Sequence, residues 1–295
     1  AIYCPSKYGL LKELTGVENL ATANGLDQAV TIVAILLGSL LFSVVFENYY
    51  RGATDVNAIL QSIAPIGWVL VILSLIEGYN TFRLPIIESE KATQEFKIRN
   101  YLDLSYLKKN IKLIRVNENI WLSILGLSIF WGVGQVVVAA FPAYYKEMTG
   151  DENAIIVQTI LAMSAIGLVL GSIVAGRVSK LHIEHGIIPV GAVGIASSLF
   201  LFAFASNFYI MGLASFLFGV FGGLFIVPLN ATIQYFAKES ELGTILAGNN
   251  FIQNIAMVVF LALTIVFVKV GLTSSMLFIF SAIITLFGSL YSIKK

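Results

Sequence analysis

Eight long apolar runs limit what this chain can fold into. A helix rises about 1.5 Å per residue and needs about 20 residues to cross the hydrocarbon core of a bilayer. Runs of that kind lie at residues 28–46, 63–82, 118–141, 153–175, 187–205, 207–229, 245–268 and 271–292. They lack the polar and apolar alternation of membrane β-strands, so we interpret them as spanning helices. The sequence therefore predicts an all-α integral membrane protein with eight spans.

The composition agrees with this prediction and excludes several soluble classes. Hydrophobic residues make up 58% of the 295 residues and charged residues 12%, whereas a soluble domain carries about 25% charged residues. The net charge of +1 supplies no basic field for a nucleic acid. One cysteine, Cys4, and two histidines, His182 and His185, favour neither a disulfide nor a metal site. No phosphate-binding glycine loop or catalytic triad is visible, so we expect no cofactor and no enzymatic activity from this chain.

Lysine and arginine gather on one side of the predicted spans. Of the 18 such residues, 15 lie in segments 1–27, 83–117, 176–186, 236–244 and 293–295. The three on the opposite side are Arg51, Lys146 and Lys269. Cytoplasmic loops of membrane proteins are enriched in these cations. The sequence therefore predicts that both ends of this segment and the 83–117 loop lie in the cytoplasm.

Two similar stretches indicate an internal repeat. Ala23–Gln28 (ANGLDQ) opens the first span, and Gly248–Gln253 (GNNFIQ) opens the seventh. Each then lies in the next-to-last helix before the 83–117 loop or before the end of the chain, as in transporters built from parallel repeats. If the halves are equivalent, four helices precede Ala1. The expected domains are the C-terminal part of an N-terminal six-helix bundle (1–82), a central cytoplasmic linker (83–117) and a C-terminal six-helix bundle (118–295).

Three regions carry more specific patterns. They are Pro5–Leu14 with Glu18–Leu20 and Ala23–Gly25, then Gly171–Ser179 with Ile183–Gly191, and then Pro228–Gln234 with Gly243–Phe251. These patterns resemble, in turn, the loop between helices four and five, the loop between helices eight and nine, and the junction of helices ten and eleven in lysophospholipid transporters. That family belongs to the major facilitator superfamily, whose plan is two six-helix halves joined by a basic cytoplasmic loop. The resemblance implies that this chain contains helices 5–12 of a twelve-helix fold.

The resemblance also implies a function. Members of this family move lysophospholipid from the outer to the inner leaflet of the bacterial inner membrane, where an acyltransferase re-acylates it. Some members are fused to acyltransferase and acyl-carrier-protein synthetase domains. We therefore expect a facilitator-type carrier whose partners are lysophospholipid, membrane lipid and an acyltransferase domain or protein. Two alternatives stay open: an exporter of drugs or small metabolites, and the membrane anchor half of a fused acyltransferase.

Side-chain amides are the candidate substrate-binding groups. In hydrocarbon an amide lies where it finds a partner, either a wet cavity or a neighbouring helix. Four pairs are four residues apart and so share a helix face. The candidates are Asn24, Gln28, Gln135, Gln158, Asn230, Gln234, Asn249, Asn250, Gln253 and Asn254. They line a pathway for a lipid headgroup, or they form hydrogen bonds between helices.

Four residues in cytoplasmic loops are candidate gating groups. Arg177 follows a glycine at a predicted helix end, and Glu184 comes seven residues later. Lys7 and Tyr8 occupy the matching region of the first half. The family resemblance implies that charges in these loops clasp the two halves of the carrier in one state and separate in the other. The alternative is that Arg177 only anchors its helix at the membrane surface and that Lys7 and Tyr8 belong to a solvated loop.

Overall fold

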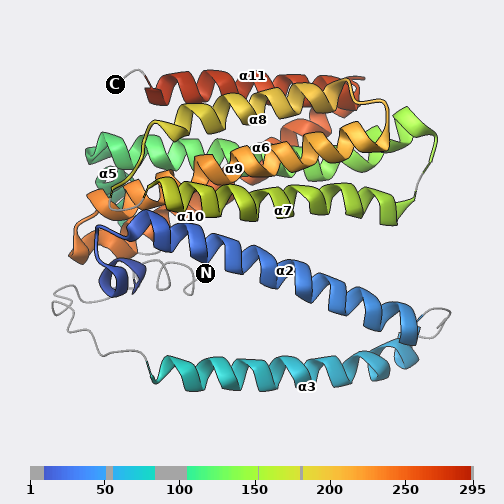
Figure 1. The fold of residues 1–295 in the computed structure, drawn as a ribbon, viewed down its shortest axis with the longest axis horizontal. Helices are drawn as coiled ribbons and strands as arrows, with labels where there is room; N and C mark the ends of the chain where they lie inside the picture. Colours follow the sequence, from blue (N-terminus) through green and yellow to red (C-terminus); the bar gives the residue numbers. More distant parts are fainter. Residues whose placement is uncertain (1–9, 51–55, 84–104, 152, 180–181, 294–295) are drawn as a thin grey trace. The chain divides into compact units, whose positions relative to one another are not determined.

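The computed structural model in Figure 1 describes residues 10–50, 56–83, 105–151, 153–179 and 182–293. A short helix covers residues 10–15. The helices that follow are α2 (Leu20–Tyr50), α3 (Val56–Thr81), α5 (Ser105–Val116), α6 (Glu118–Thr149), α7 (Ala154–Val178), α8 (Ile187–Ala203), α9 (Phe208–Phe236), α10 (Glu239–Lys269) and α11 (Ser274–Ile293). The described residues contain no β-strand. The predicted all-α class is confirmed.

Each predicted span coincides with one helix. Among the described residues, α2, α3, α6, α7, α9 and α10 contain segments long and apolar enough to cross a bilayer. The remaining two spans correspond to α8 and α11, which contribute shorter apolar segments at Ile187–Ala203 and Ser274–Gly288. Several helices extend well beyond the apolar runs that predicted them. In α9, for example, the polar residues Asn230 and Gln234 continue the helix.

Asparagines start several of these helices. The side chain of Asn117 accepts hydrogen bonds from the backbone N–H groups of Asn119 and Ile120 at the start of α6. Asn153 and Asn207 cap α7 and α9 in the same way. Such caps satisfy N–H groups that have no partner within the helix. Polar caps between apolar runs therefore fix where these helices begin.

The chain divides into two compact units. The smaller, residues 34–93, holds the C-terminal part of α2 together with α3. No residue of the apolar segment Ala64–Thr81 of α3 is buried, and Trp68 is 70% exposed. Apolar side chains on this scale need a lipid or protein environment. The larger unit, residues 1–33 with 94–295, holds α5–α11 and the start of α2.

The larger unit is built on two kinds of helix contact. In α7 and α9, Gly171 and Gly219 lie directly against the backbone of the opposite helix, so a side chain at either position would clash with it. Small residues allow membrane helices to approach this closely. Aromatic rings join α6, α8 and α11: Tyr144 meets Phe278 edge-on at 5.2 Å between ring centroids, and its hydroxyl donates to the Ala205 carbonyl at 2.6 Å. Figure 1 shows these helices running side by side.

Candidate functional site

The start of α2 lies against the end of α7 through backbone groups. The Thr22 hydroxyl donates a hydrogen bond of 2.8 Å to the Gly176 carbonyl. A Cβ atom added to Gly25 would lie 2.6 Å from the Ser172 carbonyl oxygen and 3.2 Å from the Gly176 Cα. Real Cβ atoms do not approach a carbonyl oxygen that closely, so the position requires glycine. The backbones of the two helices therefore lie in direct contact at this point.

A reciprocal amide pair joins α2 to α9. The Gln234 amide donates to Asn24 Oδ1 at 2.8 Å, and the Asn24 amide donates to Gln234 Oε1 at 3.2 Å. Asn24 also donates to the Leu20 carbonyl at 2.8 Å. Asn24 is 3% exposed and Gln234 is 0% exposed. Both amides are thus removed from solvent and paired, as buried polar groups must be to avoid a desolvation penalty.

A cation extends this contact toward the end of α9. The Lys12 ammonium donates a 2.7 Å hydrogen bond to the carbonyl of Ala237, the residue that caps α9. Burial lowers the pKa of Lys12, and the negative charge of Glu239 opposes that shift. Orphan carbonyls at a helix C-terminus attract cations. A small apolar cluster completes the contact: Leu20, Ala21 and Ala231.

The amides of α10 form a different arrangement. Gln253 donates to Asn249 Oδ1 at 2.6 Å, one turn away on the same helix. Asn254 donates to the Asn250 backbone carbonyl at 2.8 Å. Asn249 is buried, Gln253 and Asn250 are half-buried, and Asn254 is exposed. These bonds stay within one helix, so they leave polar atoms accessible along its surface.

The other predicted binding residues are more dispersed. Gln28, Gln135 and Asn230 are half-buried, and Gln158 is exposed. Within the described residues, these four side chains make no hydrogen bond. Among the ten predicted amides, the structure joins residues from different helices at the Asn24 and Gln234 pair.

The predicted gating residues do not form one cluster in the described part of the chain. Glu184 accepts hydrogen bonds from His182 at 3.2 Å and from the Gly186 N–H at 3.0 Å. The bond from His182, and secondarily that from Gly186, lowers the pKa of Glu184. Arg177 is exposed at the end of α7 and is not the partner of this carboxylate. Lys7 and Tyr8 lie outside the described residues.

Sequence reasoning missed several residues of the α2 contact. Thr22, Gly25 and Gly176 belong to it through backbone proximity, and nothing in a single sequence reveals which glycine faces another helix. His185 also belongs to this region, although the sequence gives no signal of its contact. Its Nε2 lies 3.0 Å from the Thr232 hydroxyl of α9, which itself donates to the Pro228 carbonyl. His185 therefore ties the loop between α7 and α8 to the same region of α9.

Comparison with known proteins identifies the family. The profile of the Major Facilitator Superfamily matches residues 1–261. This chain belongs to that superfamily. The crystal structure of the Escherichia coli fucose:proton symporter FucP superimposes with a TM-score of 0.76 at 11% sequence identity, covering 99% of this chain and 73% of that protein. At this identity the likeness establishes the fold, which is the predicted major facilitator bundle.

Two relatives of this chain are lysophospholipid transporters. The lysophospholipid transporter LplT of Yersinia enterocolitica is 32% identical over 273 residues, covering 92% of this chain and 63% of the relative. LplT of Photorhabdus laumondii is 28% identical over 272 residues, covering 92% and 64%. The predicted resemblance to lysophospholipid transporters is confirmed. The chain spans less than two thirds of the length of these relatives.

Proposed function

We propose that this chain is the larger part of a secondary transporter that moves lysophospholipid across the bacterial inner membrane by alternating access. The likeness to lysophospholipid transporters supports the substrate class. Family membership supplies the transport mechanism, since facilitators move one helical bundle against the other around a central site. An exporter of drugs or small metabolites is the competing function, and the transport assay below separates the two.

The proposed organisation follows the internal repeat. Residues 1–82 contribute two helices to an N-terminal bundle, residues 83–117 form the linker, and residues 118–295 form the C-terminal bundle. Both ends of the segment face the cytoplasm, because 15 of 18 lysines and arginines lie on that side of the spans. An acyltransferase, fused or separate, consumes the delivered lysophospholipid in this scheme.

The buried pair between Asn24 and Gln234 is the observation that best supports alternating access. It joins a helix assigned to the N-terminal bundle to one assigned to the C-terminal bundle. We assign it as a cytoplasmic clasp, which keeps the cytoplasmic side of the carrier closed in the outward-facing state. When the bundles separate, each amide loses its partner, which costs about 1–3 kcal/mol for a group that stays buried. Water or a lipid headgroup entering the gap replaces the lost hydrogen bonds and allows the inward-facing state.

The α10 amides are the proposed headgroup site. Their hydrogen bonds remain inside the helix, so Asn250 and Asn254 keep unused donors and acceptors on an accessible surface. A zwitterionic or phosphate headgroup is bound by such groups when it leaves water. Asn249 and Gln253 hold the neighbouring face of the helix in a fixed arrangement.

The test is lipid translocation by the intact carrier. The full-length protein that contains this chain is reconstituted into proteoliposomes with fluorescent lysophosphatidylethanolamine in the outer leaflet. We expect time-dependent transfer to the inner leaflet, measured by protection from a membrane-impermeant quencher. Replacing both Asn250→Leu and Asn254→Leu is expected to reduce the rate at least tenfold, because the headgroup then meets apolar side chains.

A matched control is Val258→Leu, an exposed apolar position on the same helix. It is expected to transport at the rate of the unmodified protein. If the unmodified carrier does not translocate lysophospholipid, the substrate assignment is wrong and the exporter is favoured. If it does, but the double variant transports normally, the headgroup site lies elsewhere.

A further inference from the structure

Helix α5 carries a dense basic face. Lys108, Lys109, Lys112 and Arg115 lie within eight residues, and no acidic residue occurs between 104 and 117. At about 100° per residue, the four cations occupy an arc of about 120° on one side of the helix. All four side chains are exposed. Within the described residues, the three lysines form no ion pair.

The opposite face of α5 is anchored to the bundle. Ile114 is fully buried, and it lies so close to Gly248 of α10 that a side chain at Gly248 would clash with it. Leu113 packs against the same core. The apolar face is therefore satisfied by α6 and α10, and the basic face needs a different partner.

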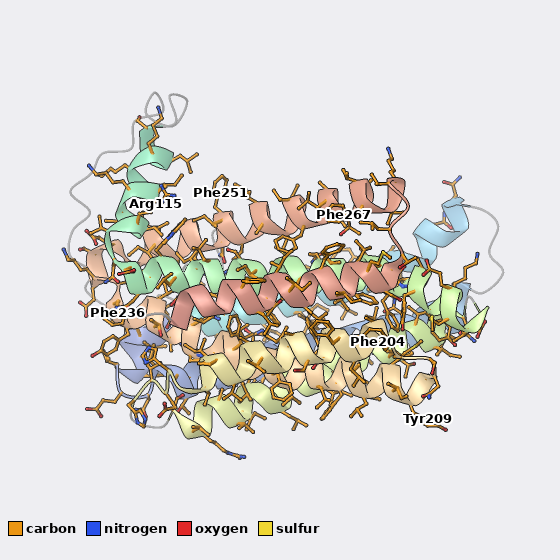
Figure 2. All side chains as sticks on the ribbon, turned by 90° about the horizontal axis from the view of Figure 1, so that it is seen from above. Arg115, Phe204, Tyr209, Phe236, Phe251 and Phe267 are labelled. Atoms are coloured by element: carbon orange, nitrogen blue, oxygen red, sulfur yellow. The ribbon has the colours of Figure 1, made fainter. Side chains whose placement is uncertain are left out.

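The direction of α5 indicates that this helix lies along the membrane boundary. Figure 2 shows α5, which ends near the labelled Arg115, running across the ends of the long helices instead of along them. The apolar helix α6 begins at Glu118, three residues after Arg115. If α6 and α10 cross the bilayer, a helix that crosses their ends lies in the plane of the headgroups.

A cation–π contact also supports a position of α5 at the level of the headgroups. The Arg115 guanidinium lies 4.8 Å from the ring centroid of Trp121, in the first turn of α6. Tryptophan is enriched at membrane interfaces, where its ring sits at headgroup level. Next to Arg115, Val116 is 78% exposed. This is an apolar side chain beside basic ones, a combination that suits the boundary between headgroups and acyl chains.

We propose that α5 is a docking surface for anionic phospholipid of the leaflet on its own side of the membrane. Its four cations bind phosphate-bearing headgroups such as phosphatidylglycerol, and its apolar face holds the helix against α6 and α10. Juxtamembrane clusters of four or more cations attract anionic lipid in this way. This surface is separate from the α10 amides. The proposal therefore does not depend on which substrate the carrier transports.

Trp121 provides a reporter at this surface. The full-length carrier bearing Trp68→Phe and Trp131→Phe, with any tryptophan outside this chain also replaced, is reconstituted into phosphatidylcholine bilayers. Brominated phosphatidylglycerol or brominated phosphatidylcholine is then added as a contact quencher. We expect phosphatidylglycerol to quench Trp121 preferentially, and the preference to fall as salt is raised from about 0.05 to 0.5 M.

Charge removal gives the decisive comparison. Lys108→Gln with Lys112→Gln is expected to reduce the preference about twentyfold, since each cation near an anionic surface contributes about fivefold, or roughly 1 kcal/mol. Lys108→Arg with Lys112→Arg is expected to retain it. The matched control, Lys238→Gln with Lys269→Gln, removes the same charge from exposed positions outside α5 and is expected to retain it too.

Two results would overturn the proposal. One is equal quenching by the two lipids in the unmodified protein, which would assign the basic face to an acidic protein partner or to solvent. The other is a preference that survives Lys108→Gln with Lys112→Gln. The tryptophan replacements could disturb folding. In that case the lysine variants are made in the protein with its natural tryptophans, and the phosphatidylglycerol that co-purifies with each variant is compared.

Discussion

The two repeat-related stretches, Ala23–Gln28 and Gly248–Gln253, use the same kinds of side chain in different ways. In the first, Asn24 reaches out of its helix to Gln234 of α9, and both are buried. In the second, Asn249 accepts a bond from Gln253 of the same helix, and the next turn ends in the exposed Asn254. The first arrangement joins helices, whereas the second leaves polar groups on a helix surface.

In the proposed carrier, this difference corresponds to two roles: contact between the bundles and binding of the substrate. An amide pair between helices stabilises one arrangement of them and is lost when they part. Amides paired within a helix persist whatever the neighbouring helices do, so they stay in place for a ligand in every state. In the proposed function, the first stretch is therefore the clasp and the second is the candidate headgroup site.

The largest effect is expected where α2 and α7 meet through backbone. Gly25→Val introduces a Cβ that would lie 2.6 Å from the Ser172 carbonyl oxygen, so α2 must move away from α7. We expect a loss of about 1–3 kcal/mol, the usual range for overpacking, measured as thermal unfolding of the detergent-solubilised full-length carrier. Gly38→Val in the same helix is the control, because nothing lies near its Cβ position. Equal destabilisation by the two variants would refute the close contact.

A smaller effect is expected at the amide pair. Gln234→Leu leaves the Asn24 amide buried without its partner, and Asn24→Leu does the converse. In a double-mutant cycle measured by the same unfolding assay, we expect the combined variant to recover about 1 kcal/mol relative to the sum of the single variants. Strict additivity would show that the two amides do not support each other.

The α10 amides are expected to behave in the opposite way. Asn250→Leu with Asn254→Leu should change the free energy of unfolding by less than about 0.5 kcal/mol, because surface substitutions outside special features stay within that range. The measurement is the unfolding assay used for the clasp. A loss as large as that from Gln234→Leu would show that these residues join helices, and the contrast between the two stretches would disappear.

The smallest effect concerns the loop between α7 and α8. The hydrogen bonds from His182 and Gly186 lower the pKa of Glu184 in the folded protein. Their contribution to stability is therefore present above the ordinary glutamate pKa of about 4.3 and is lost as pH falls through the lowered value. Glu184→Gln should remove this acid-side dependence, measured as unfolding temperature between pH 6 and the acid limit of folding. If the pH profile of the Glu184→Gln variant is unchanged, the Glu184 carboxylate is not the cause of the loss of stability at acid pH.

The helices were predictable from sequence because hydropathy is a local property. Each apolar run had to become a helix in lipid, whatever its neighbours. Contacts between distant segments were not predictable in the same way. Asn24 and Gln234 were both selected as candidate amides, yet they are 210 positions apart and no periodicity relates them. Gly25 gave no signal of its own, since its role exists only in relation to the Ser172 carbonyl.

Charge patterns predicted where charged residues lie better than they predicted which side chains interact. The 83–117 loop mixes acidic and basic residues. Its described part, from Ser105 onward, is a helix with its cations on one side. The prediction that Arg177 and Glu184 are gating groups rests on the family resemblance and stays a prediction. In the structure, the Glu184 carboxylate accepts a hydrogen bond from His182, two residues away.

In the proposed carrier, the glycine contact between α2 and α7 has a consequence for how sharply the two helices change position. Dispersion between closely packed atoms falls steeply, and a gap of less than 1 Å already forfeits a quarter to a half of it. Long side chains would follow a retreating helix and keep partial contact, whereas Gly25 and Gly176 have none to extend. The attraction across this seam is therefore of very short range. Intermediate separations gain little from it, so the protein is expected to occupy two discrete positions with a narrow transition between them.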